Sequence, residues 1–123
     1  MPMQADPWPT SIDYDPAQKT VTVSFDSGDR FALAAEYLRV ESPSAEVQGH
    51  SPSEKQTVPG RQHVGIITME PVGNYAVRIT FDDLHDTGIF SWRYLHELGR
   101  EHTERWARYL EALARKGLSR DPG

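Results

Sequence analysis

Apolar and polar positions alternate over two neighbouring stretches near the N-terminal end of the chain. A period of two is typical of half-buried strands, and the Asp-Ser-Gly-Asp sequence between the stretches favours a turn. The pattern predicts a hairpin, with a short edge strand over residues 11–14 before it. The apolar face of the hairpin consists of Val21, Val23, Phe25, Phe31 and Leu33.

Two segments without a clear strand pattern follow the hairpin. Residues 34–39 have helix-forming composition and are long enough for a turn or two, which points Tyr37 and Leu38 at the sheet and Arg39 elsewhere. Residues 40–63 have almost no apolar periodicity and are rich in Ser, Pro, Glu, Gln and Gly. We expect a long mobile loop there, and such loops inside a compact domain are usually functional or disordered.

Strand patterns return in the second half of the chain. An apolar strand beginning near Val64 is followed by a turn over residues 71–74 and an alternating strand, and this pair is expected at the centre of the sheet. Residues 82–87 form a polar connection, and residues 88–90 form a brief further strand. The alternating strand is expected to place one face inward, through Tyr75, Val77, Ile79 and Phe81.

A helical pattern occupies the C-terminal part of the chain. Ser91 is expected to cap a helix that begins at Trp92, Gly99 to divide it, and Gly117 to end it. The aromatic residues of the pattern are expected to pack into the core, whereas Trp8 and Tyr94 are expected to be exposed. The apolar positions recur near the helical period at Trp92, Leu95, Leu98, Trp106 and Leu113.

Composition limits the chemistry. The chain has 123 residues, no cysteine and a formal net charge of −5. Its length corresponds to one domain, and the absence of cysteine excludes disulfides, thiolate zinc sites and cysteine nucleophiles. The negative charge argues against binding to nucleic acid or to an anionic membrane. With no apolar run of membrane-spanning length, we expect a cytoplasmic protein. The one basic cluster is interleaved with acids: Arg105, Arg108, Arg115, Lys116 and Arg120.

The strongest concentration of candidate ligands or acid–base groups is the connection that contains Asp83, His85 and Asp86. Imidazole and carboxylates are the metal ligands that remain when thiolates are absent. The alternative interpretation is a solvated turn in which Asp caps backbone amides and His packs its ring. Motifs for nucleotide binding, serine hydrolysis and HExxH metal sites are absent from the sequence.

Three segments carry a family resemblance: Tyr37-Leu38-Arg39, EPVGNYA from Glu70 and LHDTGIFSW from Leu84. Together they resemble the small β-rich domain at the N-terminus of γ-butyrobetaine and trimethyllysine hydroxylases, which also occurs as free-standing bacterial proteins of unassigned role. The resemblance covers approximately residues 9–98. It implies a domain without the catalytic β-helix of the hydroxylases, and therefore no oxygenase activity.

The resemblance also implies a zinc site that this chain has lost. In the hydroxylases, three closely spaced cysteines follow the Leu-Arg sequence, and a histidine in an Asp-Gly-His turn completes the site. The matching positions are Ser42, Ser44 and Val47, so only His85 remains of the ligand set. Leu84 replaces the glycine before the histidine, which suggests a turn with a different φ requirement or packing contact. No metal or other cofactor is expected.

These observations predict an α+β, mainly β fold with about six short antiparallel strands, a short helix and a C-terminal helix packed on the sheet. Residues 1–10 are assigned as a disordered lead-in, 11–117 as the domain and 118–123 as a tail. The leading function is a noncatalytic binding module for a protein partner, with Arg39, Asp83, His85 and Asp86 as binding candidates. Family analogy suggests a role accessory to metallocofactor or iron–sulfur proteins. The alternatives are a metal or acid–base enzyme site centred on His85, and a structural homodimer.

Overall fold

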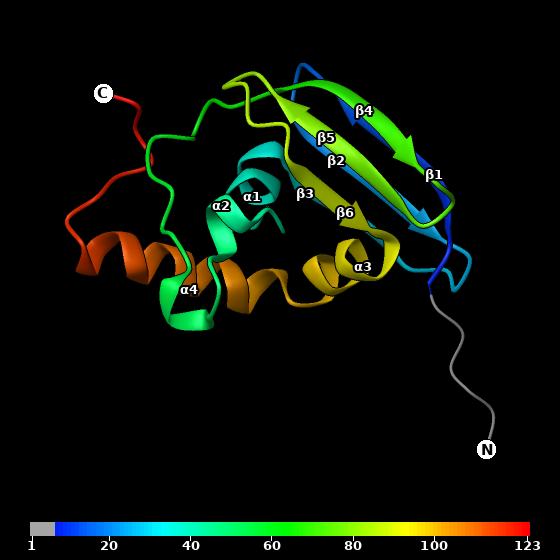
Figure 1. Ribbon diagram of the computed structural model, residues 1–123. Coiled ribbons are helices and arrows are strands. Elements are labelled where there is room, and N and C mark those ends of the chain that lie inside the picture. Colours follow the sequence, from blue (N-terminus) through cyan, green and yellow to red (C-terminus); the bar gives the residue numbers. More distant parts are fainter. Residues whose placement is uncertain (1–6) are drawn as a thin grey trace.

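The computed structural model describes residues 7–123, and it contains two small antiparallel sheets (Figure 1). The order within the sheets is β1-β2-β3 and β4-β5-β6, so each middle strand has two hydrogen-bonded neighbours. The predicted α+β fold is confirmed, with its six strands divided between two sheets. The strands are β1 Pro9–Asp15, β2 Thr20–Phe25, β3 Arg30–Ala34, β4 Ile66–Val72, β5 Ala76–Phe81 and β6 Gly88–Ser91.

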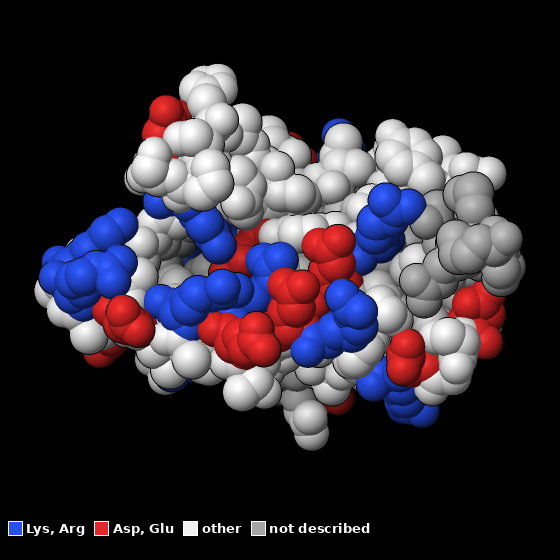
Figure 2. Space-filling view, turned by 90° about the horizontal axis from the view of Figure 1, so that it is seen from below, with Lys and Arg blue, Asp and Glu red and all other residues white. Residues whose placement is uncertain are grey.

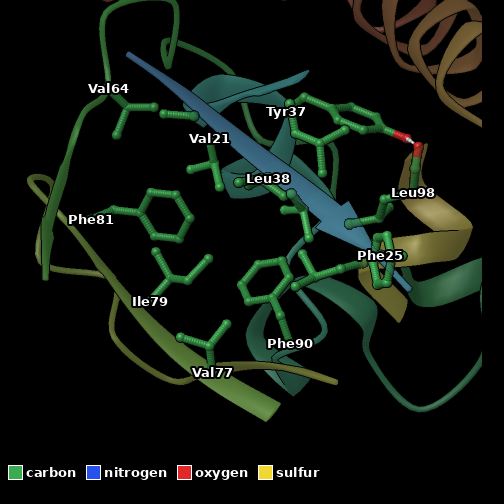
Figure 3. Packing of buried hydrophobic residues seen from close by; sticks show 14 residues of the cluster. Val21, Phe25, Tyr37, Leu38, Val64, Val77, Ile79, Phe81, Phe90 and Leu98 are labelled. Atoms are coloured by element: carbon green, nitrogen blue, oxygen red, sulfur yellow. Dashed lines mark hydrogen bonds between the residues drawn. The ribbon is translucent and has the colours of Figure 1, made fainter. Parts of the chain in front are cut away.

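The core lies between the two sheets and the helices beside them. Figure 3 shows Val21 and Phe25 of β2 on one side and Ile79 and Phe81 of β5 on the other. These alternate positions are buried, as the period of two predicted for both middle strands. At the edge of this core, the buried hydroxyl of Tyr37 donates a hydrogen bond to the carbonyl of Leu98 at 2.7 Å. This bond joins the helix over residues 35–40 to the helix over residues 92–100.

The helices gather along one side of the paired sheets (Figure 1). Ser91 caps the helix after β6, because its Oγ accepts a hydrogen bond from the Tyr94 amide at 3.1 Å. The predicted division of the C-terminal helical region is present at Glu101, two residues after Gly99. The helices are α1 Ala35–Val40, α2 Ala45–Gln48, the 3-10 helix η1 Pro52–Glu54, α3 Trp92–Arg100 and α4 His102–Arg115.

The expectation of a long mobile loop over residues 40–63 is wrong where short helices form, at residues 45–48 and 52–54. Helix α2 and η1 lie within it, and Ser42, Ser44 and Val47 are buried. Ser44 caps α2 by accepting a hydrogen bond from the amide of Glu46 at 3.2 Å. Helices of four and three residues are too short to produce a periodic apolar pattern, so periodicity could not predict them.

Three further expectations need correction. Tyr75 was placed on the inward face of a strand, but it lies in the turn before β5 and its side chain is 56% exposed. Tyr94 is partly buried, since its hydroxyl donates a hydrogen bond to the carbonyl of Glu41. The strand that was expected over residues 11–14 begins at Pro9, within the assigned lead-in; residues 1–6 of that lead-in lie outside the described residues.

The C-terminal segment is packed against the rest of the chain. The amides of Gly60 and Gln62 donate hydrogen bonds to the carbonyls of Ser119 and Arg120 at 2.9 and 3.0 Å. Arg120 also forms a bidentate ion pair with Glu36 of α1. The residues assigned as a tail therefore hold the segment around residue 60 in place. None of the described helices is long and apolar enough to cross a bilayer.

Candidate functional site

The connection between β5 and β6 is a tight turn that presents Asp83 and His85 to the helices. The amide of Phe81 donates to the carbonyl of His85 at 2.9 Å, and the amide of His85 donates to Asp83 Oδ1 at 3.1 Å. Leu84, between them, has a φ of +72° and a side chain that is 76% exposed. Leucine therefore adopts here the left-handed backbone that glycine adopts most easily.

Asp83 joins two arginines from different parts of the chain. Its Oδ2 accepts hydrogen bonds from Arg39 Nε at 2.7 Å and Arg61 Nε at 2.6 Å. Desolvation acts to raise the pKa of Asp83, but the bonds from Arg39, the His85 amide and Arg61 together hold it below its usual value. Arg39, which was expected to point elsewhere, is buried, and its Nη1 is a buried donor without a hydrogen-bond partner within the described chain.

The buried side chain of His85 forms a second group, the His85 cluster, with Ser42 and Glu46. Nε2 lies 2.9 Å from Ser42 Oγ, and Nδ1 lies 3.1 Å from Glu46 Oε2. Desolvation, followed by the positive charge of Arg39, lowers the pKa of His85, so the ring is neutral at pH 7. A carboxylate only accepts, so Nδ1 donates to Glu46 and Nε2 accepts from the Ser42 hydroxyl.

This order of hydroxyl, imidazole and carboxylate is the arrangement that activates serine nucleophiles. A nucleophile must also reach its substrate, and Ser42 is completely buried. The backbone of β6 covers it so closely that a Cβ added to Gly88 would lie 2.5 Å from Ser42 Oγ. In this conformation the relay holds α2 against the turn and leaves Oγ without access to a substrate.

The structure brings together some of the binding candidates and separates one. Arg39 and Asp83 share an ion pair, and His85 lies beside them through its backbone contact with Asp83. Asp86 is exposed and lies outside both groups. The four candidates therefore do not converge on one pocket. Arg61, Ser42 and Glu46, which the sequence did not place in the site, complete these contacts.

The positions that match the zinc ligands of the resembling hydroxylases do meet in space, but their side chains do not fit a zinc ion. Ser42 bonds to His85, Ser44 Oγ lies 2.7 Å from Thr87 Oγ1, and Val47 is buried without a donor atom. Zinc in structural sites takes Cys, His or carboxylate ligands. In the part of the chain that the structure describes, no three His, Asp or Glu residues are grouped to hold a metal.

A groove of about 670 Å³ lies elsewhere, beside α4. We call it the α4 groove: one wall is the helix from Arg105 to Lys116, and the other is the segment from Pro52 to Thr57. Figure 2 views the molecule from the helical side, where blue side chains gather over the C-terminal end of α4. The sequence showed the basic residues of α4, but nothing in it placed a second wall about 50 residues earlier.

The α4 groove is built around a buried carboxylate. Glu41 Oε1 accepts from Lys55 Nζ at 2.9 Å and from Arg105 Nη1 at 2.8 Å, and its side chain is 3% exposed. Tyr109 lies on the floor, where its hydroxyl donates to the carbonyl of Val58 at 2.6 Å. Burial raises the pKa of Tyr109 to about 12, so the phenol stays neutral. These contacts fix both walls.

The lining of the α4 groove is positively charged. Five cations face two carboxylates, Glu41 and Glu111, and Arg105 also pairs with Glu101 at 2.9 Å, so two positive charges are in excess. Lys116 Nζ donates to the neutral Thr57 hydroxyl at 2.8 Å, and Arg115 makes a long 3.4 Å contact with Glu111. Arg108 is exposed and has no ion pair or hydrogen bond among the residues described. This excess stands out on a chain whose net charge is −5.

Comparison with known proteins assigns the chain to a family. The model of the gamma-butyrobetaine hydroxylase-like N-terminal domain matches residues 12–96. The chain belongs to this family. Two proteins of 44% and 40% identity, with structures determined by NMR in solution, each superpose with a TM-score of 0.83. The first match covers 97% of this chain and 94% of the other, and the second covers 99% and 91%.

A third solved structure is similar to part of the chain. It is a crystal structure of a protein of unknown function, of the DUF971 family, from Acidithiobacillus ferrooxidans, with 37% identity and a TM-score of 0.63. The match covers 74% of this chain and 91% of the other. No curated protein matches the chain significantly. The gamma-butyrobetaine hydroxylase-like N-terminal family model ends at residue 96, so the whole helical wall of the α4 groove lies beyond it.

Proposed function

We propose that this chain is a noncatalytic binding module that engages a protein partner through the α4 groove. The observation that carries the proposal is a contrast between two places. Ser42 and His85 are buried and bonded to each other, whereas the cations of the α4 groove face an open space with two positive charges in excess of the carboxylates. Buried, satisfied polar groups stabilise a fold, and exposed groups at a concave surface are available for binding.

The construction of the groove supports a binding role. Its walls come from separate segments, and ion pairs to Glu41 and the bond between Lys116 and Thr57 hold them at a fixed separation. A surface that is already formed loses little conformational entropy when it binds, which favours affinity. The partner would therefore meet a rigid groove.

Photocrosslinking tests this proposal. A photoreactive amino acid is placed at Ser53, an exposed residue that lines the α4 groove, and at Ser27, an exposed residue in the turn between β2 and β3. Irradiation in the native host is expected to join a protein to position 53 and not to position 27. The captured protein is then purified, and its binding to the unmodified chain is measured. Equal capture at both positions, or no binding between the purified proteins, contradicts the proposal.

A second candidate, an acid–base site centred on His85, is favoured by the relay from Glu46 to Ser42. It requires an opening of β6 or α2 that exposes Ser42 Oγ. Incubation with a fluorophosphonate probe distinguishes the candidates. Covalent labelling of the folded chain that disappears in Ser42→Ala supports the enzyme, and an unlabelled chain supports the binding module.

A further inference from the structure

We infer that the α4 groove binds an extended acidic segment of the partner protein, with its carboxylates on Arg108 and Arg115. This inference rests on the proposed function and names the chemistry of the occupant. Among the cations that line the groove, Arg108 is the one without a hydrogen bond or ion pair to the described residues, and Arg115 is held only by the long contact with Glu111. Both are available to anions without breaking a buried ion pair.

The spacing of these arginines favours an extended chain over a small anion. Residues seven positions apart on a helix share a face and are separated by roughly 10 Å along the axis. A single carboxylate or phosphate group is too small to bridge that separation. The helical wall from Arg105 to Lys116 is about 16 Å long, which corresponds to about five residues of extended chain. Carboxylates a few residues apart on such a segment reach both arginines.

The floor of the groove accepts a peptide backbone and small side chains. Pro52 and Ala112 supply apolar surface between the charged rims. An acidic segment with interspersed neutral residues can therefore place its carboxylates on the rim and its other side chains on the floor. Apolar contact at the centre with charged contact at the rim is a common arrangement in protein interfaces.

The position of Glu111 disfavours a nucleic acid as the occupant. Glu111 lies on the same helix between Arg108 and Arg115, where it would repel one of the regularly spaced phosphates of a nucleic acid strand. A peptide avoids this repulsion by presenting a neutral residue there. Tyr109, the aromatic residue of the lining, is buried and its hydroxyl is bonded to Val58, so it offers no face for stacking bases.

Fluorescence anisotropy with a synthetic probe tests the inference. The probe is a labelled peptide of about eight residues in which Glu alternates with Ser, long enough to span the helical wall in extended form. The chain variants are Arg108→Glu with Arg115→Glu, and the control Arg30→Glu, which reverses an exposed charge at the start of β3. Circular dichroism verifies that each variant is folded.

We expect saturable binding of the Glu peptide by the wild-type chain and by Arg30→Glu. The double variant is expected to bind at least about tenfold more weakly, since attraction becomes repulsion at both contacts. Addition of salt from about 50 to 200 mM should weaken wild-type binding. A peptide with Lys in place of Glu should not bind.

Three results of the peptide experiment overturn the inference. The first is that the wild-type chain shows no saturable binding of the Glu peptide. The second is that the double variant binds the peptide as tightly as wild type does, and the third is that a single-stranded oligonucleotide of the same charge binds the wild-type chain as tightly as the peptide does, or more tightly. If the partner captured at Ser53 binds the double variant as well as it binds wild type, the inferred acidic segment is rejected but the proposed function stands. If no partner is captured at Ser53 in the otherwise wild-type chain, the proposed function is rejected. A dimer that forms through the groove, detected by sedimentation and abolished in the double variant, replaces the partner by a second copy.

Discussion

Ser42 Oγ and His85 Nε2 lie 2.9 Å apart in the interior of the protein, although 43 residues separate them in the sequence. The family resemblance led us to expect that both positions correspond to zinc ligands of the hydroxylases. Here a hydroxyl and an imidazole meet directly, and Glu46 completes the line of hydrogen bonds. This line of hydrogen bonds ties α2 to the turn before β6.

The first prediction concerns the pH dependence of stability. The pKa of folded His85 lies below the ordinary value of 6.5, because burial and Arg39 disfavour the charged ring. The unfolded chain therefore binds the proton more readily. The contribution of His85 is fully present above about pH 6.5 and is lost as the pH falls towards the folded pKa.

Urea unfolding between about pH 7.5 and 5.5 measures this effect. The free energy of unfolding is expected to fall with pH in the wild type, and to fall less in His85→Gln, where the buried titrating group is gone. Other titrating groups remain in both proteins, so the difference between the two slopes is the signal. Parallel slopes would show that the proton of His85 is not coupled to folding.

A second prediction concerns the backbone of Leu84. Its φ of +72° is costly for leucine and accessible to glycine, and its side chain is mostly exposed. Leu84→Gly is expected to stabilise the protein by about 0.5–1 kcal/mol, after the greater entropy of unfolded glycine is subtracted. Leu84→Ala, which removes the same side chain but keeps the Cβ, should not stabilise it. Thermal unfolding of the two variants distinguishes them, and equal melting temperatures would contradict the explanation.

A third prediction compares two ion pairs on one helix. Arg105 contacts the buried Glu41, whereas Arg115 contacts the exposed Glu111. Arg105→Ala is expected to cost about 3 kcal/mol because it removes one partner of a buried carboxylate, and Arg115→Ala less than about 0.5 kcal/mol. Urea unfolding measures both, and similar costs would mean that Glu41 is not a structural centre of the groove.

A fourth prediction concerns whether replacing Gly99 by alanine stabilises or destabilises the protein. Gly→Ala inside a helix ordinarily stabilises, but a Cβ at Gly99 would overlap the ring of Phe31. Gly99→Ala is therefore expected to destabilise the protein by about 1–3 kcal/mol. In a Phe31→Leu background, where the ring is absent, the same change should cost less. Stabilisation by Gly99→Ala alone would show that α3 and β3 do not pack this closely.

The fold was largely predictable where the sequence repeats a period. Val21, Val23 and Phe25 alternate cleanly, and the structure buries all three. Ser91 before an apolar helix predicted the cap that Tyr94 confirms. Tyr75 was misassigned because it continues the alternation of β5, yet it belongs to the turn that contains Gly73, whose φ is positive. Periodicity identifies a strand more reliably than it identifies the first residue of the strand.

The candidate sites were less predictable because they depend on contacts between distant segments. The turn around His85 was recognised, but its partners Ser42 and Glu46 lie in a segment without periodicity. The basic residues of α4 could be recognised in the sequence. The opposite wall of the α4 groove, which includes Lys55, comes from the same segment without periodicity. Two short helices bring these residues into place, and their stability comes from tertiary packing rather than from local propensity.

The central claim is that binding occurs at the α4 groove and not at the His85 cluster. The most direct test is an NMR titration of the isotopically labelled chain with the partner captured at Ser53. We predict that amide shifts concentrate in residues 52–57 and 105–116, with little change over residues 83–86. Shifts concentrated over residues 83–86 instead, or spread evenly over the protein, would contradict the account.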